Sequence, residues 1–262
     1  MKTLAFLFLC ICLFGCAGGQ VPRTEQGVPC FWFLGCTTAV PSPEKKVIGS
    51  GIYWQKDIEI LLDLKIDDLR IRKIKLVEDG QGKKIICQIG EMIVFELDGP
   101  INPDSTYAVE KLLSEQSKNL CVAENGRPIA SWIFLSSGGG LLKDGYKLGE
   151  IFRKYNVTTF VVGNAKCASS CAIAFLGGVF RVMTDNAQLT FHAPYLTDGR
   201  VIDCSDRGQL DGLKVYYKKY ISDNKGAEFL YNRSMNYCSG QEGWTLNKDA
   251  AKLFGIVNQT TL

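Results

Sequence analysis

The sequence predicts an α/β fold in which helices connect parallel strands. Residues 132–135 form an apolar strand that leads into glycines 138–140, and a helix with one apolar stripe follows from residue 141. A β-branched, apolar run at residues 158–162 supplies the next strand. A strand, glycine loop, helix and strand in this order predict a right-handed crossover. The glycines should therefore lie at the carboxyl ends of parallel strands.

The same kind of pattern continues on both sides of this crossover. Residues 93–97 predict a short strand, and Asp104 or Ser105 is expected to cap the helix that follows it. Nearer the C-terminus, the apolar spacing over residues 207–237 predicts two helices.

The region before residue 90 predicts a hairpin that leads into this core. Residues 69–72 alternate between apolar and basic side chains, as a strand does. A turn at residues 79–82 then precedes the apolar residues 84–87, which are expected to pair with that strand.

Two serines and one histidine carry the candidate chemistry. Ser169 and Ser170 lie between the strand 158–162 and an apolar helix, so they should stand at a helix N-terminus, where the first amides have no intrahelical partner. Residues 187–192 alternate as a half-buried strand that ends at His192. His192 is the sole histidine and the side chain best suited to act as a base at neutral pH. A serine hydroxyl needs such a base before it becomes a strong nucleophile.

Four motifs in this region resemble the Clp protease and crotonase superfamily, and especially its Clp-protease-like exported bacterial proteins. They are Ser136-Ser137-Gly138-Gly139-Gly140, Cys167-Ala168-Ser169-Ser170-Cys171, Arg181 and Phe191-His192-Ala193-Pro194. The resemblance covers about residues 94–257 and implies a core of ββα repeats wound as a spiral, with helices around the sheet. It also implies that Ser169 is the nucleophile, that His192 is the base, and that the Gly139 and Ser170 amides form the oxyanion hole.

Each of these residues also has a plainer interpretation. Ser170 is the alternative nucleophile, Lys166 is an alternative base, and either serine could simply cap the helix. The glycines could form a turn without a ligand or a phosphate cradle, although no Gly-Lys-Ser/Thr sequence follows them. Ser137 stands where the proteases of this superfamily usually carry proline.

The resemblance further implies an acidic residue that orients His192, shortly before a final helix. The expected position carries Gly243, so the neighbouring Glu242 is assigned as the orienting carboxylate. Asp203 and Asp206 are alternatives. Without any carboxylate, the site would be a slow dyad or inactive.

The N-terminus predicts an export signal. Met1-Lys2 gives a positive end, and the apolar run at residues 4–14 is too short to span a bilayer. Leu13-Phe14-Gly15-Cys16 resembles a bacterial lipobox, which would make Cys16 the lipidated first residue of the mature protein. A plain secretory signal cut near Gly19 is the alternative. The expected location is the bacterial cell envelope, with the protein anchored in a membrane by its lipid and facing the periplasm or the exterior.

The chain therefore divides into four predicted parts. Residues 1–19 form the signal, residues 20–46 a tether, residues 47–90 a β-rich extension and residues 91–262 the catalytic domain.

Cysteine usage fits an exported chain. Of eleven cysteines, three fall in the signal and eight remain, an even number suited to disulfides in an oxidising compartment. The plausible pairs are Cys30 with Cys36, Cys87 with Cys121, and Cys204 with Cys238. Cys167 and Cys171 flank the serines, either as a disulfide that braces their turn or as two buried thiols. A metal site there is the weakest alternative, because no second pair of ligands has suitable spacing.

Composition limits the classes of function. A chain of 262 residues with 46% hydrophobic and 22% charged residues is typical of a globular protein. A net charge of +3, without a basic run interleaved with aromatics, argues against nucleic-acid binding. No cofactor is expected. The resemblance implies a serine peptidase with a peptide or protein substrate. Assembly into a homo-oligomer is an open alternative. An inactive envelope scaffold and a crotonase-like acyl-thioester enzyme are the alternatives.

Overall fold

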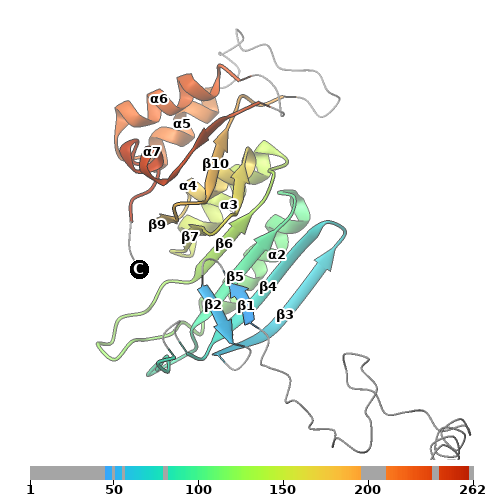
Figure 1. Cartoon of the computed structure of the whole chain (residues 1–262), viewed down its shortest axis with the longest axis vertical. Coiled ribbons are helices and arrows are strands. Elements are labelled where there is room, and N and C mark those ends of the chain that lie inside the picture. The colour runs from blue at the N-terminus through green and yellow to red at the C-terminus, as the bar shows by residue number, and fades with distance from the viewer. Residues whose placement is uncertain are drawn as a thin grey trace, which may run out of the picture. The chain divides into compact units, whose positions relative to one another are not determined.

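The computed structural model describes residues 45–48, 51–54, 57–78, 82–195, 211–237 and 242–259, which all belong to one compact unit, Lys45–Leu262 (Figure 1). The predicted signal, Cys16 and the tether lie outside the described residues. So do Asp203, Asp206 and four cysteines, namely Cys30, Cys36, Cys204 and Cys238. Within the described residues the predicted α/β fold class is confirmed.

A mixed sheet of six strands forms the centre of the described unit. Its order is β3 (Ile58–Ile66), β4 (Leu69–Leu76), β5 (Ile93–Asp98), β6 (Trp132–Ser136), β7 (Thr158–Val161) and β9 (Phe180–Met183). The first three strands are antiparallel, and β5, β6, β7 and β9 are parallel. The carboxyl ends of the parallel strands therefore share one edge of the sheet, as the order of strand, glycine loop and helix predicted.

Three helices connect the parallel part: α2 (Pro103–Gln116), α3 (Leu142–Lys154) and α4 (Ser170–Leu176). The N-cap of α2 is Asn102, not the predicted Asp104 or Ser105. The Asn102 side chain accepts the Ser105 N–H, and the Ser105 hydroxyl accepts the Asn102 N–H in return. Pro103 then occupies the first turn, where its missing N–H costs nothing.

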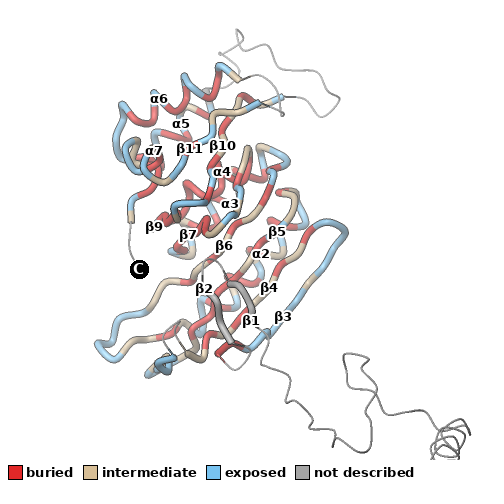
Figure 2. The backbone as a smooth tube through the Cα atoms, viewed as in Figure 1, coloured by how far each residue is buried: buried red, intermediate tan, exposed pale blue. Residues whose placement is uncertain are grey.

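The central strands bury both of their faces. In β6, Ile133 and Leu135 belong to the main apolar core that also contains residues of the three helices. Trp132 and Phe134 point the other way and pack against Phe160, with ring centroids 5.3 and 4.9 Å apart. Figure 2 shows this contrast, with buried central strands and an exposed edge strand β3. Burial on both faces explains why these strands are continuously apolar in sequence.

The predicted hairpin upstream of the core is wrong in its pairing. Residues 69–76 do form a strand, but β4 pairs with β3 through a turn at Asp67-Asp68. Residues 84–87 form no strand, and only Lys84 makes an isolated bridge, with Glu78. The reason is that β4 has no open edge, because it pairs with β3 on one side and with β5 on the other; Cys87 instead forms a disulfide with Cys121 in a small separate core. β3 was missed because a bulge between Ile60 and Leu62 interrupts the alternation of apolar and charged residues along the strand.

A second, smaller sheet carries the candidate site. It contains β8 (Lys166–Ala168), β10 (Gln188–Phe191) and β11 (Trp244–Leu246), in the order β11-β10-β8. β10 runs parallel to β8 and antiparallel to β11. Because β8 and β10 are parallel neighbours, their C-terminal ends, at Ala168 and Phe191, lie at the same edge of this sheet.

The C-terminal helices are α5 (Asp211–Tyr220), α6 (Asn224–Ser234) and α7 (Lys248–Leu253), and they lie beyond β10 in Figure 1. The two helices predicted over residues 207–237 are thus confirmed for the described part of that range. β1 (Lys45–Ile48) and β2 (Gly51–Trp54) form a separate antiparallel pair. Among the helices of the described residues, none combines the length and apolar character needed to cross a membrane.

Candidate functional site

Ser169 occupies a strained turn between a strand and a helix. β8 ends at Ala168 and α4 begins at Ser170, so the chain reverses direction at this one residue. Its backbone has φ 56° and ψ −126°, a combination that residues with a side chain rarely adopt. Its N–H donates to the carbonyl of Thr190 at 2.8 Å, which ties the turn to β10. Although Ser169 is the N-cap of α4, its hydroxyl makes no capping hydrogen bond, so helix capping does not explain this serine.

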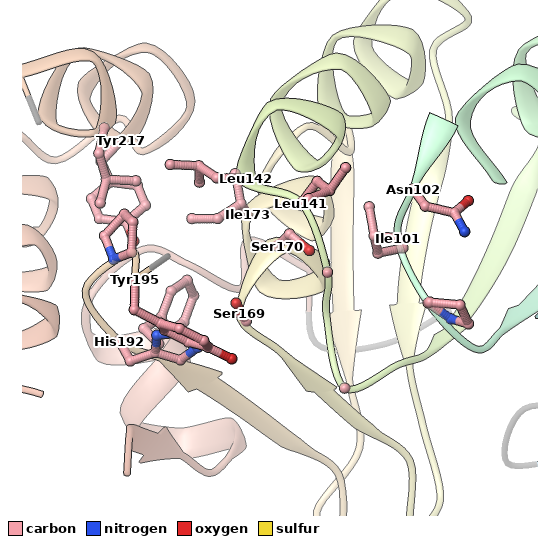
Figure 3. Close-up of a pocket in the computed structure, with 16 residues that line it drawn as sticks. Ile101, Asn102, Leu141, Leu142, Ser169, Ser170, Ile173, His192, Tyr195 and Tyr217 are labelled. Carbon is pink, nitrogen blue, oxygen red and sulfur yellow. The ribbon is translucent and has the colours of Figure 1, made fainter. Parts of the chain in front are cut away.

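The two adjacent serines point into different surroundings. Ser170 is only 2% exposed, and its β-carbon packs against α3, where an added β-carbon on Gly145 would lie 2.8 Å from it. Its hydroxyl has no hydrogen-bond partner within the described part of the chain. Ser169 is half-buried instead, and Figure 3 shows its hydroxyl on the side of His192. Of the two, Ser169 is the accessible hydroxyl.

Backbone strain at Ser169 predicts an unusual order of stability. Ser169→Gly and Ser169→Ala both remove the hydroxyl, but glycine adopts a positive φ without steric cost. We expect the glycine variant to be more stable by about 1 kcal/mol, after its larger unfolded-state entropy is subtracted from the strain it relieves. Urea unfolding of both variants measures the difference. An alanine variant of equal or greater stability would show that the turn is relaxed.

A cavity of about 280 Å³ brings the candidate residues together. Ser169, Ser170 and His192 line it, together with Gly138 and Gly140 of the glycine loop (Figure 3). The remaining wall is mostly apolar and includes Leu141, Leu142, Ile173, Leu213 and Tyr217. The alternative base, Lys166, is exposed and is not among the lining residues.

His192 is held in a defined tautomer by its own backbone neighbour. Its Nδ1 lies 2.7 Å from the carbonyl oxygen of Ala193. Because a carbonyl can only accept a hydrogen bond, Nδ1 must carry a proton, so in the neutral ring it is Nε2 that has the lone pair. The ring also lies against Tyr195, with centroids 5.4 Å apart. Sequence reasoning missed Tyr195, which is 42% exposed and carries no motif.

The position expected for an orienting carboxylate does lie beside His192. Phe191 pairs with Trp244, which brings the preceding Gly243 next to the histidine. A β-carbon added to Gly243 would lie 3.8 Å from that of His192. Gly243 has no side chain, and the adjacent Glu242 is exposed. In this structure the contact made by Nδ1 is the Ala193 carbonyl rather than a carboxylate.

The glycine loop passes directly against the serine turn. Gly139 and Gly140 have φ values of 103° and 154°, which favour glycine. A β-carbon on Gly139 would lie 2.6 Å from that of Ser169, and one on Gly140 would overlap the Ile101 carbonyl. However, the Gly139 N–H donates to the hydroxyl of Ser137 at 3.0 Å. One signal of this contact was present in the sequence, namely Ser137 at a position where the proteases of the superfamily that the motifs resemble usually carry proline.

Two disulfides lie in the described residues, and one of them brackets the serines. Cys87 pairs with Cys121, as predicted. Cys167 pairs with Cys171, which selects the disulfide over the two free thiols. Both cysteines of the second pair are fully buried, and the bond links the end of β8 to the first turn of α4 across Ser169. It thus closes the base of the strained turn.

Removing each disulfide should separate stability from reactivity. The two cysteines are 34 residues apart in the Cys87–Cys121 disulfide and 4 residues apart in the Cys167–Cys171 disulfide. Loop-closure entropy therefore predicts a loss of about 4 kcal/mol for the Cys87→Ala/Cys121→Ala pair and about 2 kcal/mol for the Cys167→Ala/Cys171→Ala pair. We expect the second pair, not the first, to slow the reaction of Ser169 with a fluorophosphonate by about tenfold or more, because only it frees the turn. Equal labelling rates in both double variants would contradict a bracing role.

Arg181, the third of the four motifs, anchors the C-terminal turn instead of lining the cavity. It is 3% exposed, and its guanidinium donates to the carbonyls of Leu176, Gly178, Gly255 and Ile256. Burial, and secondarily the charge of Arg153, lowers the pKa of Arg181 to about 10. It therefore remains protonated at neutral pH and can keep all of its donors.

No group of three or more histidine, cysteine or acidic side chains within the described ranges is arranged to hold a metal ion.

Comparisons with known proteins find likeness at the level of structure. No family model and no curated protein matches the sequence. Among solved structures, a mutant of ClpP1 from Listeria monocytogenes is similar, with a TM-score of 0.48 and 18% identity over 63% of this chain and 89% of that chain. A mutant of the membrane-bound stomatin-specific protease 1510-N is similar with a TM-score of 0.48 and 14% identity, over 63% of this chain and 77% of that chain. The chain is thus structurally similar, at low identity, to these two proteases.

Proposed function

We propose that this chain is a serine hydrolase with Ser169 as nucleophile and His192 as base. The observation that carries the proposal is the strained backbone of Ser169, whose hydroxyl caps no helix and lines a cavity together with His192. Strain of this kind persists only where the surroundings enforce it, and it is concentrated at functional sites. If Ser169 had only a structural role, glycine at this position would make the protein more stable, because glycine adopts the positive φ without strain.

The proposed reaction is acyl transfer followed by hydrolysis. The Ser169 oxygen bonds to the acyl carbon of the substrate, and its proton passes to Nε2 of His192. His192 returns that proton to the leaving group as the bond to the acyl carbon breaks. Water then attacks the acyl-enzyme with His192 again as base, which releases the acid and restores the Ser169 hydroxyl.

Two backbone amides are the proposed donors to the oxyanion. Ser170 N–H is the first amide of α4, and such amides have no partner within the helix. Gly139 lies against Ser169, so its N–H needs only the correct orientation to reach the same oxygen. A donor that points at the oxyanion commonly contributes a factor of about 10²–10³ to the rate.

We propose a peptide bond as the scissile bond, on the basis of the four motifs shared with Clp-type proteases. The apolar wall of the cavity is compatible with an apolar residue next to that bond. We also propose export, with Cys16 as the lipid anchor in the cell envelope, because Met1-Lys2, the short apolar run and the lipobox-like Leu13-Phe14-Gly15-Cys16 occur together.

The test is a panel of fluorogenic peptides, esters and acyl-thioesters with the full chain and with Ser169→Ala. Hydrolysis of peptides or esters that disappears in the variant supports the proposal. Thioester turnover that survives Ser169→Ala would favour the crotonase-like alternative instead, because that chemistry uses the amides without a nucleophile. Catalysis of none of these reactions by the folded protein would favour the scaffold, for which the missing side chain at Gly243 is the supporting observation.

The role of Glu242 can be separated from that of the Ala193 carbonyl. If the carbonyl orients His192, Glu242→Gln should change kcat/KM by less than about threefold. If Glu242 is the third member of a triad, the loss should approach the factor of about 10⁴ known for such carboxylates. Steady-state kinetics with the best substrate of the panel distinguish the two outcomes. Glu228→Gln on the exposed face of α6 serves as the control.

A further inference from the structure

The Gly139 N–H faces a serine hydroxyl instead of the substrate. It donates to the hydroxyl oxygen of Ser137 at 3.0 Å. Ser137 is 5% exposed, and neither it nor Gly139 is among the residues that line the cavity. The amide assigned to the oxyanion is therefore already engaged beneath the loop. An amide donates one strong hydrogen bond, so this contact and an oxyanion contact compete.

The chain on both sides of this amide is fixed. Ser137 forms a bridge with Cys167: its N–H donates to the Lys166 carbonyl at 2.8 Å, and its own carbonyl accepts the Ala168 N–H at 2.9 Å. On the other side, the Gly139 carbonyl accepts the Ile101 N–H at 2.9 Å. The Ser137 hydroxyl is consequently presented from a rigid anchor.

One peptide unit, with a glycine on each side, lies between these anchors. A flip of the peptide plane between Gly138 and Gly139 changes ψ of the first residue and φ of the second, and glycine tolerates either sign of φ. An added β-carbon on Gly138 would meet no atom within 4 Å, so the space around it is open. The flip needs no movement of the two anchors.

We propose that Ser137 is a positioning residue that holds the oxyanion amide of Gly139 turned away from the substrate. This inference rests on the proposed hydrolase function and assigns a residue that limits its rate. The loop has two orientations: one in which the N–H donates to Ser137, and one in which it donates to the substrate oxygen. The substrate must displace the Ser137 hydroxyl, so the active orientation is a minor state until substrate arrives.

Removing the hydroxyl should therefore speed the reaction. The net strength of one such hydrogen bond corresponds to a population shift of about three- to tenfold. We expect Ser137→Ala to raise kcat/KM and the second-order rate of fluorophosphonate labelling by that factor. Ser137→Thr keeps a hydroxyl and should return the rate to that of the unmodified chain. Proline would also remove the hydroxyl, but it would remove the Ser137 N–H that donates to the Lys166 carbonyl as well. Alanine removes the hydroxyl alone.

The experiment compares the full chain with Ser137→Ala, Ser137→Thr and, as a neighbouring control, Ser136→Ala. It measures labelling rates and hydrogen exchange of the Gly139 amide. Faster labelling and faster exchange in Ser137→Ala alone support the proposal. Labelling of the unmodified chain with no gain in Ser137→Ala relative to Ser136→Ala would overturn it. Absence of labelling in all four proteins would instead overturn the hydrolase function, and unchanged exchange at Gly139 would still refute the contact with Ser137.

Discussion

His192→Ala is expected to slow fluorophosphonate labelling of Ser169 by a factor of about 10³ or more, because general-base catalysis contributes about 10²–10⁴ and an unassisted hydroxyl is a weak nucleophile. The structure allows this role because Nδ1 is committed to the Ala193 carbonyl and Nε2 is left as the acceptor. Labelling rates at fixed probe concentration provide the measurement.

Two controls separate the base from a structural role. Tyr195→Leu removes the ring that lies against the imidazole while keeping His192, and should reduce labelling by less than about tenfold. Added imidazole should partly restore labelling in His192→Ala, since the deleted side chain leaves space beside the cavity. A His192→Ala variant that labels as fast as the unmodified chain would exclude His192 as the base.

Arg181→Met is expected to lower the free energy of unfolding by about 3–5 kcal/mol, a large share of the stability of an ordinary domain. Methionine has a similar length, but it removes the side-chain donor from the Leu176, Gly255 and Ile256 carbonyls, while Gly178 keeps the donor from Arg153. Those carbonyls come from the end of α4 and from the turn after α7, so the loss would detach the C-terminal segment. Equilibrium unfolding in urea measures the change.

The matched control for this substitution is Arg127→Met, at an exposed position in a turn. It should change stability by less than about 0.5 kcal/mol, as surface substitutions usually do. Because Arg181 does not line the cavity, the folded fraction of Arg181→Met should still react with a fluorophosphonate. A variant of unchanged stability would mean that the Leu176, Gly255 and Ile256 carbonyls find other donors.

The parallel part of the fold was predictable because its signals are local. Apolar runs, the glycine loop and the strand ending at His192 each report a structure that neighbouring residues enforce. In β3 the signal was broken, since three apolar residues in a row at the bulge between Ile60 and Leu62 interrupt its alternation. The pairing of residues 84–87 was wrong for another reason. Both edges of β4 are occupied by β3 and β5, which the local turn pattern cannot reveal, so pairing across that turn stops at the bridge between Glu78 and Lys84.

The candidate site was predictable in its residue types but not in its hydrogen bonds. Sequence order placed Ser169, His192 and the glycines on adjacent loops, because parallel strands end at one edge. Two hydrogen bonds depend on the orientation of single groups, which no residue pattern encodes. They are the one from His192 Nδ1 to the Ala193 carbonyl and the one from the Gly139 N–H to the Ser137 hydroxyl. Gly243 illustrates the same limit. Its position beside His192 was expected, but the sequence does not show that the partner of Nδ1 is the Ala193 carbonyl.

The central claim is that Ser169 is an activated nucleophile. The most direct measurement is to treat the full chain with a fluorophosphonate, digest it and locate the adduct by peptide mass spectrometry. We expect one adduct, on Ser169, that is absent in Ser169→Gly and strongly reduced in His192→Ala. An adduct on Ser170, or a folded protein with no adduct, would contradict it.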